Sequence, residues 1–297
     1  MQISDNMRGA FLMMGSMVAF TVNDAFLKAV SDELPLFQAL FLRGIGTVVC
    51  LIILAHVLGQ FRLSFGAKVW ALIGLRSAAE VLAAIFFLTA LFNMPLANVT
   101  AVLQALPLTV TLAGAVFLGE AIGWRRMLAI LVGFSGVFLI VRPGAEGFNV
   151  YSLYALAAVG CVTLRDLVVR RMPRDVPSVM VGLVAAVAVM VFGGVACLTE
   201  DWAPVTTVAA AQLGGAMVAI VFGYVFSVAA MRGGDLGFVA PFRYAGLIAA
   251  LILGWLVFAE WPDAVTLTGA AIVVATGLFT LLRERHTARR STIGRLR

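Results

Sequence analysis

The sequence has little charge and little of the chemistry that soluble enzymes use. Only 12% of its 297 residues are charged, about half the fraction of a typical soluble domain. It contains two histidines and three cysteines. The cysteines lie in apolar runs, with no Cys-x-x-Cys spacing and no histidine beside them, so they indicate neither a zinc site nor a disulfide framework. We therefore expect no metal and no cofactor.

Apolar side chains are abundant instead. They make up 62% of the chain and give a mean hydropathy of +1.05. A folded domain of this length still exposes a large share of its area, so it could not hide that much apolar surface from water. The composition excludes a soluble globular enzyme, a disordered chain and a nucleic-acid-binding domain. The net charge of +6 lies in short loops and a tail, and we expect no nucleic-acid partner.

The apolar residues form ten runs, each long enough for a helix that crosses a bilayer, which needs about 20 residues. The runs are continuous and do not alternate with polar residues, which favours helices over a barrel. The sequence therefore predicts an all-α integral membrane protein with ten transmembrane helices in the lipid bilayer. The runs are 9–30, 36–57, 70–92, 97–118, 124–141, 151–169, 177–198, 208–230, 237–258 and 264–282.

The basic residues between these runs orient the chain. If the N-terminus is cytoplasmic, the cytoplasmic loops and N-terminus carry nine Lys and Arg residues, and the outer loops carry only Lys28 and Arg142. The tail at 284–297 adds further arginines on the cytoplasmic side. Because cytoplasmic segments are enriched in Lys and Arg, we expect both termini in the cytoplasm.

The two halves of the chain resemble each other. Several polar residues and prolines match at an offset of 142, and others match at an offset of 140 beyond one short insertion or deletion. The matched pairs are Thr21 with Thr163, Asp24 with Asp166, Lys28 with Arg170, Pro35 with Pro177, Ala90 with Ala230, Val99 with Val239 and Glu120 with Glu260. We infer two five-helix repeats, at residues 8–141 and 150–283, followed by a basic cytoplasmic tail.

Each repeat has an odd number of helices, which has a topological consequence. The second copy must enter the membrane from the opposite side, and this makes an inverted repeat. Inverted repeats recur in secondary transporters, because exchanging the conformations of the two halves converts an outward-open state into an inward-open one. The pattern favours alternating access, although channels can also be built this way.

One stretch of the sequence gives the most specific indication of a protein family. Residues 90–107, followed by Phe117-Leu-Gly-Glu120, have a counterpart that runs from Ala229 through Pro241 to Glu260. With ten spans in two halves, the chain resembles the EamA-like family of the drug/metabolite transporter superfamily. The resemblance implies a secondary carrier in the bacterial inner membrane, a monomer or homodimer, with a central cavity lined mainly by the first four helices of each half.

The same resemblance implies a small-molecule substrate without identifying it, because the family carries chemically diverse metabolites. A vitamin such as riboflavin and an amino-acid-like compound are the two guesses that it suggests. Coupling to a proton gradient is a further expectation. The sequence has no Gly-x-x-x-x-Gly-Lys motif, so we do not expect direct drive by ATP.

Seven charged side chains lie inside the expected spans, more than two residues from either end. Each costs about 2.5–3.5 kcal/mol at a helix centre unless it faces a partner or water, so these residues are the first candidates for a site. They are Asp24, Arg43, Arg76, Glu80, Arg165, Asp166 and Arg243. Four arginines against three acids leave one net positive charge, which points to a substrate with a carboxylate, a phosphate or another electron-rich group.

We assign the candidates to three roles. Arg165 and Asp166 are expected to form an ion pair or a gate. Glu80 is expected to carry the coupling proton, although Arg76 shares its helix face at the i, i+4 spacing and opposes protonation. The expected substrate-binding set is Asp24, Arg43, Arg76, Glu80, Gln104, Arg243 and Tyr244.

Two prolines inside spans add a structural clue. Pro107 lies in the middle of the fourth span and Pro241 near the start of the ninth. Each lacks a backbone N–H and bends its helix, and bent helices in corresponding positions of two halves are a pointer to a transport site. Two other functions stay open at this point: a membrane enzyme acting on a lipid-linked substrate, and a passive channel. The sequence contains no His-rich cluster or Asp-rich motif that would support the enzyme.

Overall fold

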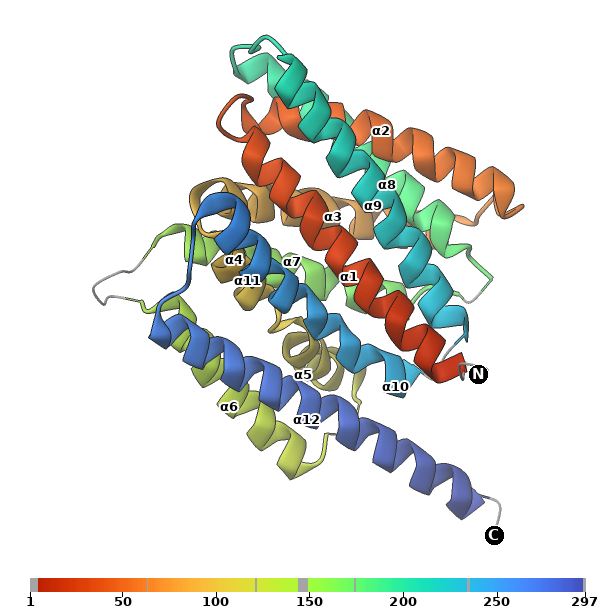
Figure 1. Cartoon of the computed structure of the whole chain (residues 1–297). Helices are drawn as coiled ribbons and strands as arrows, with labels where there is room; N and C mark the ends of the chain where they lie inside the picture. The colour runs from red at the N-terminus through yellow and green to blue at the C-terminus, as the bar shows by residue number, and fades with distance from the viewer. Residues whose placement is uncertain are drawn as a thin grey trace. The chain divides into compact units, whose positions relative to one another are not determined.

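The structure is a computed structural model (Figure 1). It describes residues 5–62, 64–120, 122–143, 149–173, 175–233 and 236–295, although it leaves the side chains at 228, 231–237 and 283–295 undescribed. Throughout these ranges the secondary structure is helical, with no strand. The helices are α1 (Asp5–Val30), α2 (Leu36–Val57), α3 (Ala67–Asn93), α4 (Leu96–Leu103), α5 (Leu106–Leu118), α6 (Trp124–Val141), α7 (Tyr151–Arg170), α8 (Ser178–Ala196), η1 (Cys197–Thr199), α9 (Thr207–Gly233), α10 (Leu236–Val239), η2 (Ala240–Tyr244), α11 (Ala245–Phe258) and α12 (Ala264–Arg295).

The prediction of ten spans is confirmed. Among the described residues, ten helical segments are long and apolar enough to cross a membrane. They coincide with the ten apolar runs to within a few residues at most ends. Helix α1 begins earlier than expected, at Asp5, where a carboxylate in the first turn favours the helix dipole. Helix α12 continues past the expected end of its span to Arg295.

Prolines and glycines in the connections determine where several spans begin. The residue before the first helical turn is a proline for α2, α4 and α8, and a glycine for α3 and α6. A proline at this point costs no hydrogen bond, because the first N–H groups of a helix have no partner within it. Short polar connections thus give sharp helix ends, as the sequence indicates.

The fourth span was expected to be a helix bent at Pro107, and the structure divides it into two helices just before that residue. Helix α4 ends at Leu103, and α5 starts at Leu106 with Pro107 in its first turn. Pro107 has no N–H to donate to the carbonyl of Leu103, and its ring clashes with that carbonyl. The corresponding span of the second half is divided in a similar way, because η2 carries Pro241 in its first turn and lies between α10 and α11.

Helices α5 and α11 end in the same local geometry. Gly119 and Ala259 both adopt a left-handed conformation, with φ of 69° and 53°. The next residues, Glu120 and Glu260, donate their N–H groups to the carbonyls of Gly114 and Gly254, at 3.3 and 2.9 Å. The N–H groups of Gly119 and Ala259 donate to the same two carbonyls, so each helix ends with two hydrogen bonds to one acceptor. The two ends lie 140 residues apart, at the offset of the sequence match.

The chain divides into two compact units, and each takes helices from both halves of the sequence. Unit 1 comprises Met1–Val22, Pro95–Asn149 and Phe222–Arg297, and unit 2 comprises Asn23–Met94 and Val150–Val221. The boundaries fall inside α1 and α9. Packing units and sequence repeats are therefore different divisions of the chain.

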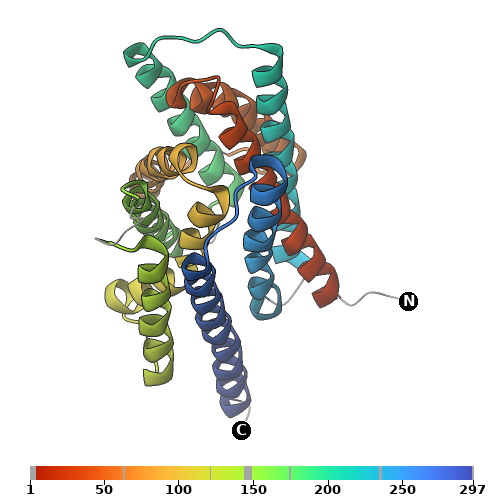
Figure 2. The same ribbon diagram turned by 60° about the vertical axis from the view of Figure 1, so that its left-hand side comes forward.

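Unit 1 is held together by close helix contacts. Helices α6 and α12 lie side by side (Figures 1 and 2). At their closest approach, a Cβ added to Gly136 would lie 2.7 Å from the carbonyl oxygen of Gly269. Elsewhere in this unit the Ser16 hydroxyl donates to the carbonyl of Gly223 at 2.7 Å. Small residues that let backbones approach and hydroxyls that bond across helices are the usual means of packing helices in a membrane.

Unit 2 is built around α3 and α8. Helix α3 packs on α7 and on α8, and α8 also packs on α2. Buried apolar residues of α2 and α8 form one cluster, which includes Leu51 and Met180. At one end of α2 the Glu200 carboxylate accepts the N–H of Phe37 at 3.2 Å, and Gln38 exchanges two hydrogen bonds with Ala203. These contacts fix the arrangement of α2, α3, α7 and α8.

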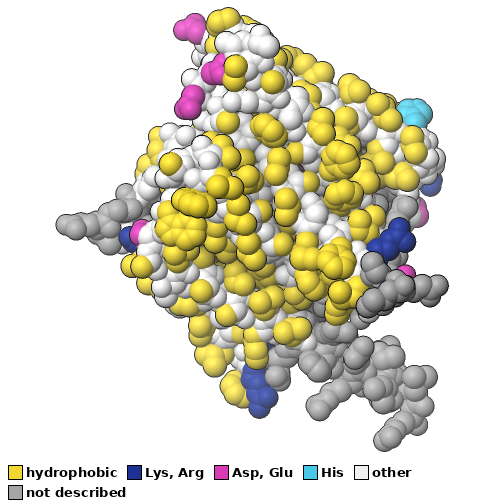
Figure 3. Space-filling model, in the orientation of Figure 1, with side chains coloured by type: hydrophobic (Ala, Val, Ile, Leu, Met, Phe, Trp, Pro, Cys, Tyr) yellow, Lys and Arg dark blue, Asp and Glu magenta, His cyan; other side chains and the backbone are white. Residues whose placement is uncertain are grey.

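The exposed surface is mostly apolar, as expected for a protein that lies in a lipid bilayer. Figure 3 shows one face covered mostly by hydrophobic side chains, with the few charged groups near its margins. Large exposed hydrophobic residues occur on many helices, among them Val49, Phe138 and Ile252. A soluble protein rarely exposes apolar area on this scale.

Candidate functional site

The charged side chains expected inside the spans are distributed unevenly. Unit 2 holds six of them and unit 1 holds only Arg243. The six are Asp24, Arg43, Arg76, Glu80, Arg165 and Asp166. Unit 2 is therefore the part of the molecule in which polar chemistry is available at membrane depth.

Four of these six residues form one network across α3 and α7. Arg165 on α7 places Nη1 at 3.2 Å from both carboxylate oxygens of Glu80 on α3. The Nε atom of Arg165 also bonds to Oδ1 of Asp166 at 3.0 Å. Arg76 completes the group, with Nη2 at 3.5 Å from Glu80 in the i, i+4 pair. Two guanidinium groups balance two carboxylates, so the network as a whole is neutral.

The side chains of the network are partly buried. The side chains of Arg76, Glu80 and Arg165 are 15%, 25% and 26% exposed. Glu80 has two arginines beside it, Arg76 and Arg165. The expectation that Glu80 carries a coupling proton stays a prediction.

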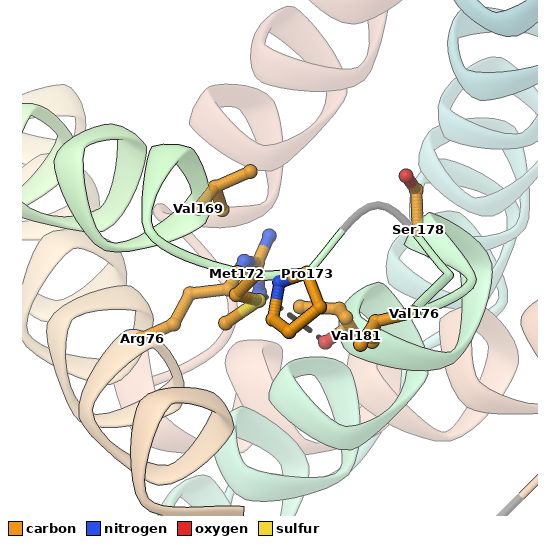
Figure 4. A pocket seen from close by; sticks show the side chains of 7 residues that line it. All are labelled: Arg76, Val169, Met172, Pro173, Val176, Ser178 and Val181. Carbon is orange, nitrogen blue, oxygen red and sulfur yellow. Dashed lines mark hydrogen bonds between the residues drawn. The ribbon is translucent and has the colours of Figure 1, made fainter. Parts of the chain in front are cut away.

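Arg76 also borders a cavity. Its Nη1 donates to the carbonyl of Val181 at 3.3 Å. Figure 4 shows the side chain extending from α3 toward Met172 and Pro173, at the connection between α7 and α8. The cavity has a volume of about 310 Å³ and is lined by Arg76, Val169, Met172, Pro173, Val176, Ser178 and Val181. One guanidinium among mostly apolar walls is an arrangement that binds an anionic or electron-rich group.

The other two of the six candidates in unit 2 are Asp24 on α1 and Arg43 on α2. Arg43 is the charged side chain that acts on Asp24 electrostatically. Asp24 accepts a hydrogen bond from Nδ2 of Asn23 at 2.9 Å. Asn23 is almost fully buried, with 3% of its surface exposed. This group is less tightly paired than the network on α3 and α7.

The other expected site residues, Gln104, Arg243 and Tyr244, lie in unit 1. Gln104 is half-buried at the end of α4, where its backbone N–H bonds to Thr100. Arg243 is exposed, and its side chain makes no ion pair or hydrogen bond with any described residue. Tyr244 is buried against Gly277 of α12, and its hydroxyl has no hydrogen-bond partner among the described residues. Arg243 thus carries the one uncompensated charge that the sequence count implies.

Sequence reasoning missed most of the cavity wall. Met172, Val176 and Val181 are ordinary apolar residues near helix ends, and nothing in their type marks a site. Arg76 is the residue of the cavity wall that the sequence singled out. No group of three or more His, Cys, Asp or Glu residues able to hold a metal occurs among the described residues.

Comparisons with known proteins agree on a family. The model of the EamA-like transporter family matches residues 7–142. The S-adenosylmethionine uptake transporter of Rickettsia conorii is 26% identical, and the match covers 95% of this chain and 94% of that protein. The pseudopaline exporter CntI of Pseudomonas aeruginosa is 26% identical over 90% of this chain and 93% of its own. The riboflavin transporter of Vibrio cholerae is 30% identical over 67% of each chain.

A solved structure agrees on the fold. A crystal structure aligns with 93% of this chain and 98% of its own, with a TM-score of 0.62 and 21% sequence identity. At that identity the likeness shows the fold alone. The relatives move different small molecules, and their names include both uptake and export. The chain belongs to the EamA-like transporter family, and it is a multi-pass membrane protein that acts as a secondary transporter of a metabolite and not as an enzyme.

Proposed function

We propose that the protein carries a small metabolite with a carboxylate or another electron-rich group, and that Arg76 binds that group. The observation that carries the proposal is the 310 Å³ cavity beside Arg76. Ligand pockets range from about 300 to 1,000 Å³, so this cavity suits a small molecule or one end of a larger one. Arg243, which is exposed in unit 1, is a separate candidate for contact with an electron-rich group.

Two substrates deserve a direct test, because the relatives' names include them. S-adenosylmethionine ends in an amino-acid head group, whose carboxylate suits Arg76 and whose ammonium suits Glu80 or Asp166. Riboflavin offers carbonyl oxygens to the same guanidinium. Both match the expected substrate classes, an amino-acid-like compound and a vitamin. The neutral network of two arginines and two acids supports a zwitterionic head group over a simple anion.

We further propose that transport runs by alternating access between two inverted repeats, residues 8–141 and 150–283. Three features support this. Helices α5 and α11 end with the same left-handed residue and the same hydrogen bonds. The fourth span of each half is interrupted beside a proline. Corresponding spans of the two halves pack against each other in three helix pairs, which are α6 with α12, α4 with α11, and α2 with α8. We place the protein in the inner membrane with both termini cytoplasmic, as a monomer or homodimer.

The test is uptake into proteoliposomes that contain the purified full chain. Arg76→Ala should reduce uptake of the transported compound at least tenfold, because a hydrogen bond to a charged group is worth about 1.5–3 kcal/mol. Arg76→Lys should recover only part of the loss, since lysine lacks the planar fork. Arg142→Lys, in an ion pair of unit 1 with Asp263, is the matched control and should transport normally. Equal uptake by Arg76→Ala and the control would contradict the proposal.

A further inference from the structure

The three carboxylates inside the spans differ in their partners. Glu80 and Asp166 both accept salt bridges from Arg165, at 3.2 and 3.0 Å. Asp24 makes no ion pair with any described residue, and its one hydrogen bond comes from the side chain of Asn23. A carboxylate in a membrane span is costly unless it is paired or wet. Of the three carboxylates, Asp24 therefore loses the fewest ionic contacts when it is protonated.

Among the described residues, the side-chain amide of Asn23 has a free acceptor for the proton of a neutral, protonated Asp24. Nδ2 of Asn23 donates to Oδ1 of Asp24 at 2.9 Å. Oδ1 of Asn23 is buried, and it has no hydrogen-bond partner among the described residues. A buried acceptor left unpaired costs about 1–3 kcal/mol. A protonated Asp24 would have an O–H to donate, and a carboxylic acid and a primary amide pair through two such bonds.

We propose that Asp24, and not Glu80, is the residue that binds and releases the coupling proton. This inference rests on the proposed function, since it assigns the proton site of the same carrier. A proton from water adds to one oxygen of the Asp24 carboxylate, and the new O–H bonds to Oδ1 of Asn23. On release the proton returns to water on the other side of the membrane. No oxidant, reductant or covalent intermediate takes part.

The charged groups around Asp24 are few. Arg43 on α2 faces it. Lys28 lies one turn along α1, and its ammonium group donates to the carbonyl of Met94. The segment of α9 in the same unit, residues 207–221, contains no titratable residue. Glu200, beyond the end of α8, accepts the N–H of Phe37 at the start of α2. Protonation of Asp24 thus removes the negative charge opposite Arg43 and leaves the network around Arg165 unchanged.

Infrared difference spectra test this without knowledge of the substrate. Purified full-length protein is titrated between about pH 6 and pH 9, where exposed Asp and Glu stay ionised. We expect a carboxylic-acid band that grows toward the acid end, is absent in Asp24→Asn and persists in Glu80→Gln. If Asp24→Asn does not fold, Asn23→Leu is the second arm. It should move the same band to higher frequency, because the acid loses its hydrogen-bonded partner.

A band that persists in Asp24→Asn, disappears in Glu80→Gln or does not move in Asn23→Leu would overturn the proposal. Transport gives the matching readout in vesicles, with S-adenosylmethionine and riboflavin as probes. Asp24→Asn should lose accumulation driven by a pH gradient, and accumulation equal to that of the wild type would overturn the proposal. If the wild type transports neither probe, the substrate proposal fails, while the infrared result still decides the role of Asp24.

Discussion

The two compact units share a scaffold and differ in chemistry. In each, a glutamate after a second-half span accepts a backbone N–H at the start of a first-half helix: Glu260 bonds to Leu96 in unit 1, and Glu200 bonds to Phe37 in unit 2, both at 3.2 Å. In each, helices from both sequence halves pack together. Yet unit 2 contains a network of four charged side chains and a cavity, whereas unit 1 contains only one of the seven charged side chains selected from the spans as site candidates.

Backbone features match between the two sequence halves more closely than charges do. Asp24 and Asp166 occupy matching positions, but the positions that match Arg76 and Glu80 at the offset of 140 hold Ala216 and Ile220. The left-handed ends of α5 and α11, in contrast, occur in both halves. Under the proposed function, the binding chemistry therefore depends on charged residues of the first half that have no charged counterpart in the second.

The largest effect is expected from Arg165→Ala. This change leaves Glu80 and Asp166 with no salt bridge from α7, in a sheltered site. Because these side chains are only partly buried, we expect a loss between the about 1 kcal/mol of an exposed pair and the about 3 kcal/mol of a buried one. Thermal unfolding in detergent should show a clear loss of stability. Arg142→Ala in unit 1 is the control, since its partner Asp263 is 55% exposed and such pairs contribute about 1 kcal/mol or less. Equal losses would remove the contrast between the units.

A smaller loss is expected from Gly136→Leu in unit 1. Its added side chain would meet the backbone of Gly269 and force α6 and α12 apart. Overpacking of this kind costs about 1–3 kcal/mol. Gly160→Leu on α7 is the matched control, because a Cβ there meets nothing within 4 Å. Size-exclusion profiles and unfolding temperatures should show a loss for Gly136→Leu and little change for Gly160→Leu. The same loss in both would mean that the crossing is not packed as described.

The smallest effect concerns acid stability at the Arg142–Asp263 pair. The N–H of Thr266 bonds to the Asp263 carboxylate at 2.8 Å and, together with Arg142, holds the pKa of that carboxyl below its usual value. The resulting stability is present above the carboxyl's unfolded pKa and is lost as the pH falls through its lower folded pKa. Asp263→Asn should therefore be slightly less stable than the wild type at neutral pH and equal to it in strong acid. A difference that does not change with pH would contradict this sign.

Much of the fold follows from the sequence, because it depends on local signals. Apolar length predicts the ten spans, and loop prolines such as Pro35 and Pro177 locate helix starts. The break before Pro107 follows from its missing N–H, although the run was expected to be one bent helix. The extension of α12 to Arg295 has no comparable signal in the apolar pattern.

The site was only partly predictable, because its decisive contacts are tertiary. The sequence predicts the Arg76–Glu80 pair from spacing on one helix, and the cost of charge in lipid singles out Arg165. That Arg165 reaches Glu80 depends on the packing of α7 against α3, which no local pattern specifies. The unsatisfied oxygen of Asn23 is equally invisible in sequence, since it depends on what surrounds the amide.

The central claim is that substrate binds in unit 2 beside Arg76, and protection of a single cysteine tests it most directly. With Cys50, Cys161 and Cys197 replaced by serine, Met172→Cys places a thiol in the cavity wall, and Val265→Cys places one on exposed α12 of unit 1. A membrane-impermeant thiol reagent is added to inside-out vesicles for Met172→Cys and to right-side-out vesicles for Val265→Cys, with S-adenosylmethionine or riboflavin present or absent. The account predicts that the transported compound slows labelling at residue 172 and leaves residue 265 unchanged. Labelling at residue 172 that is unaffected by a compound the same vesicles transport would contradict it.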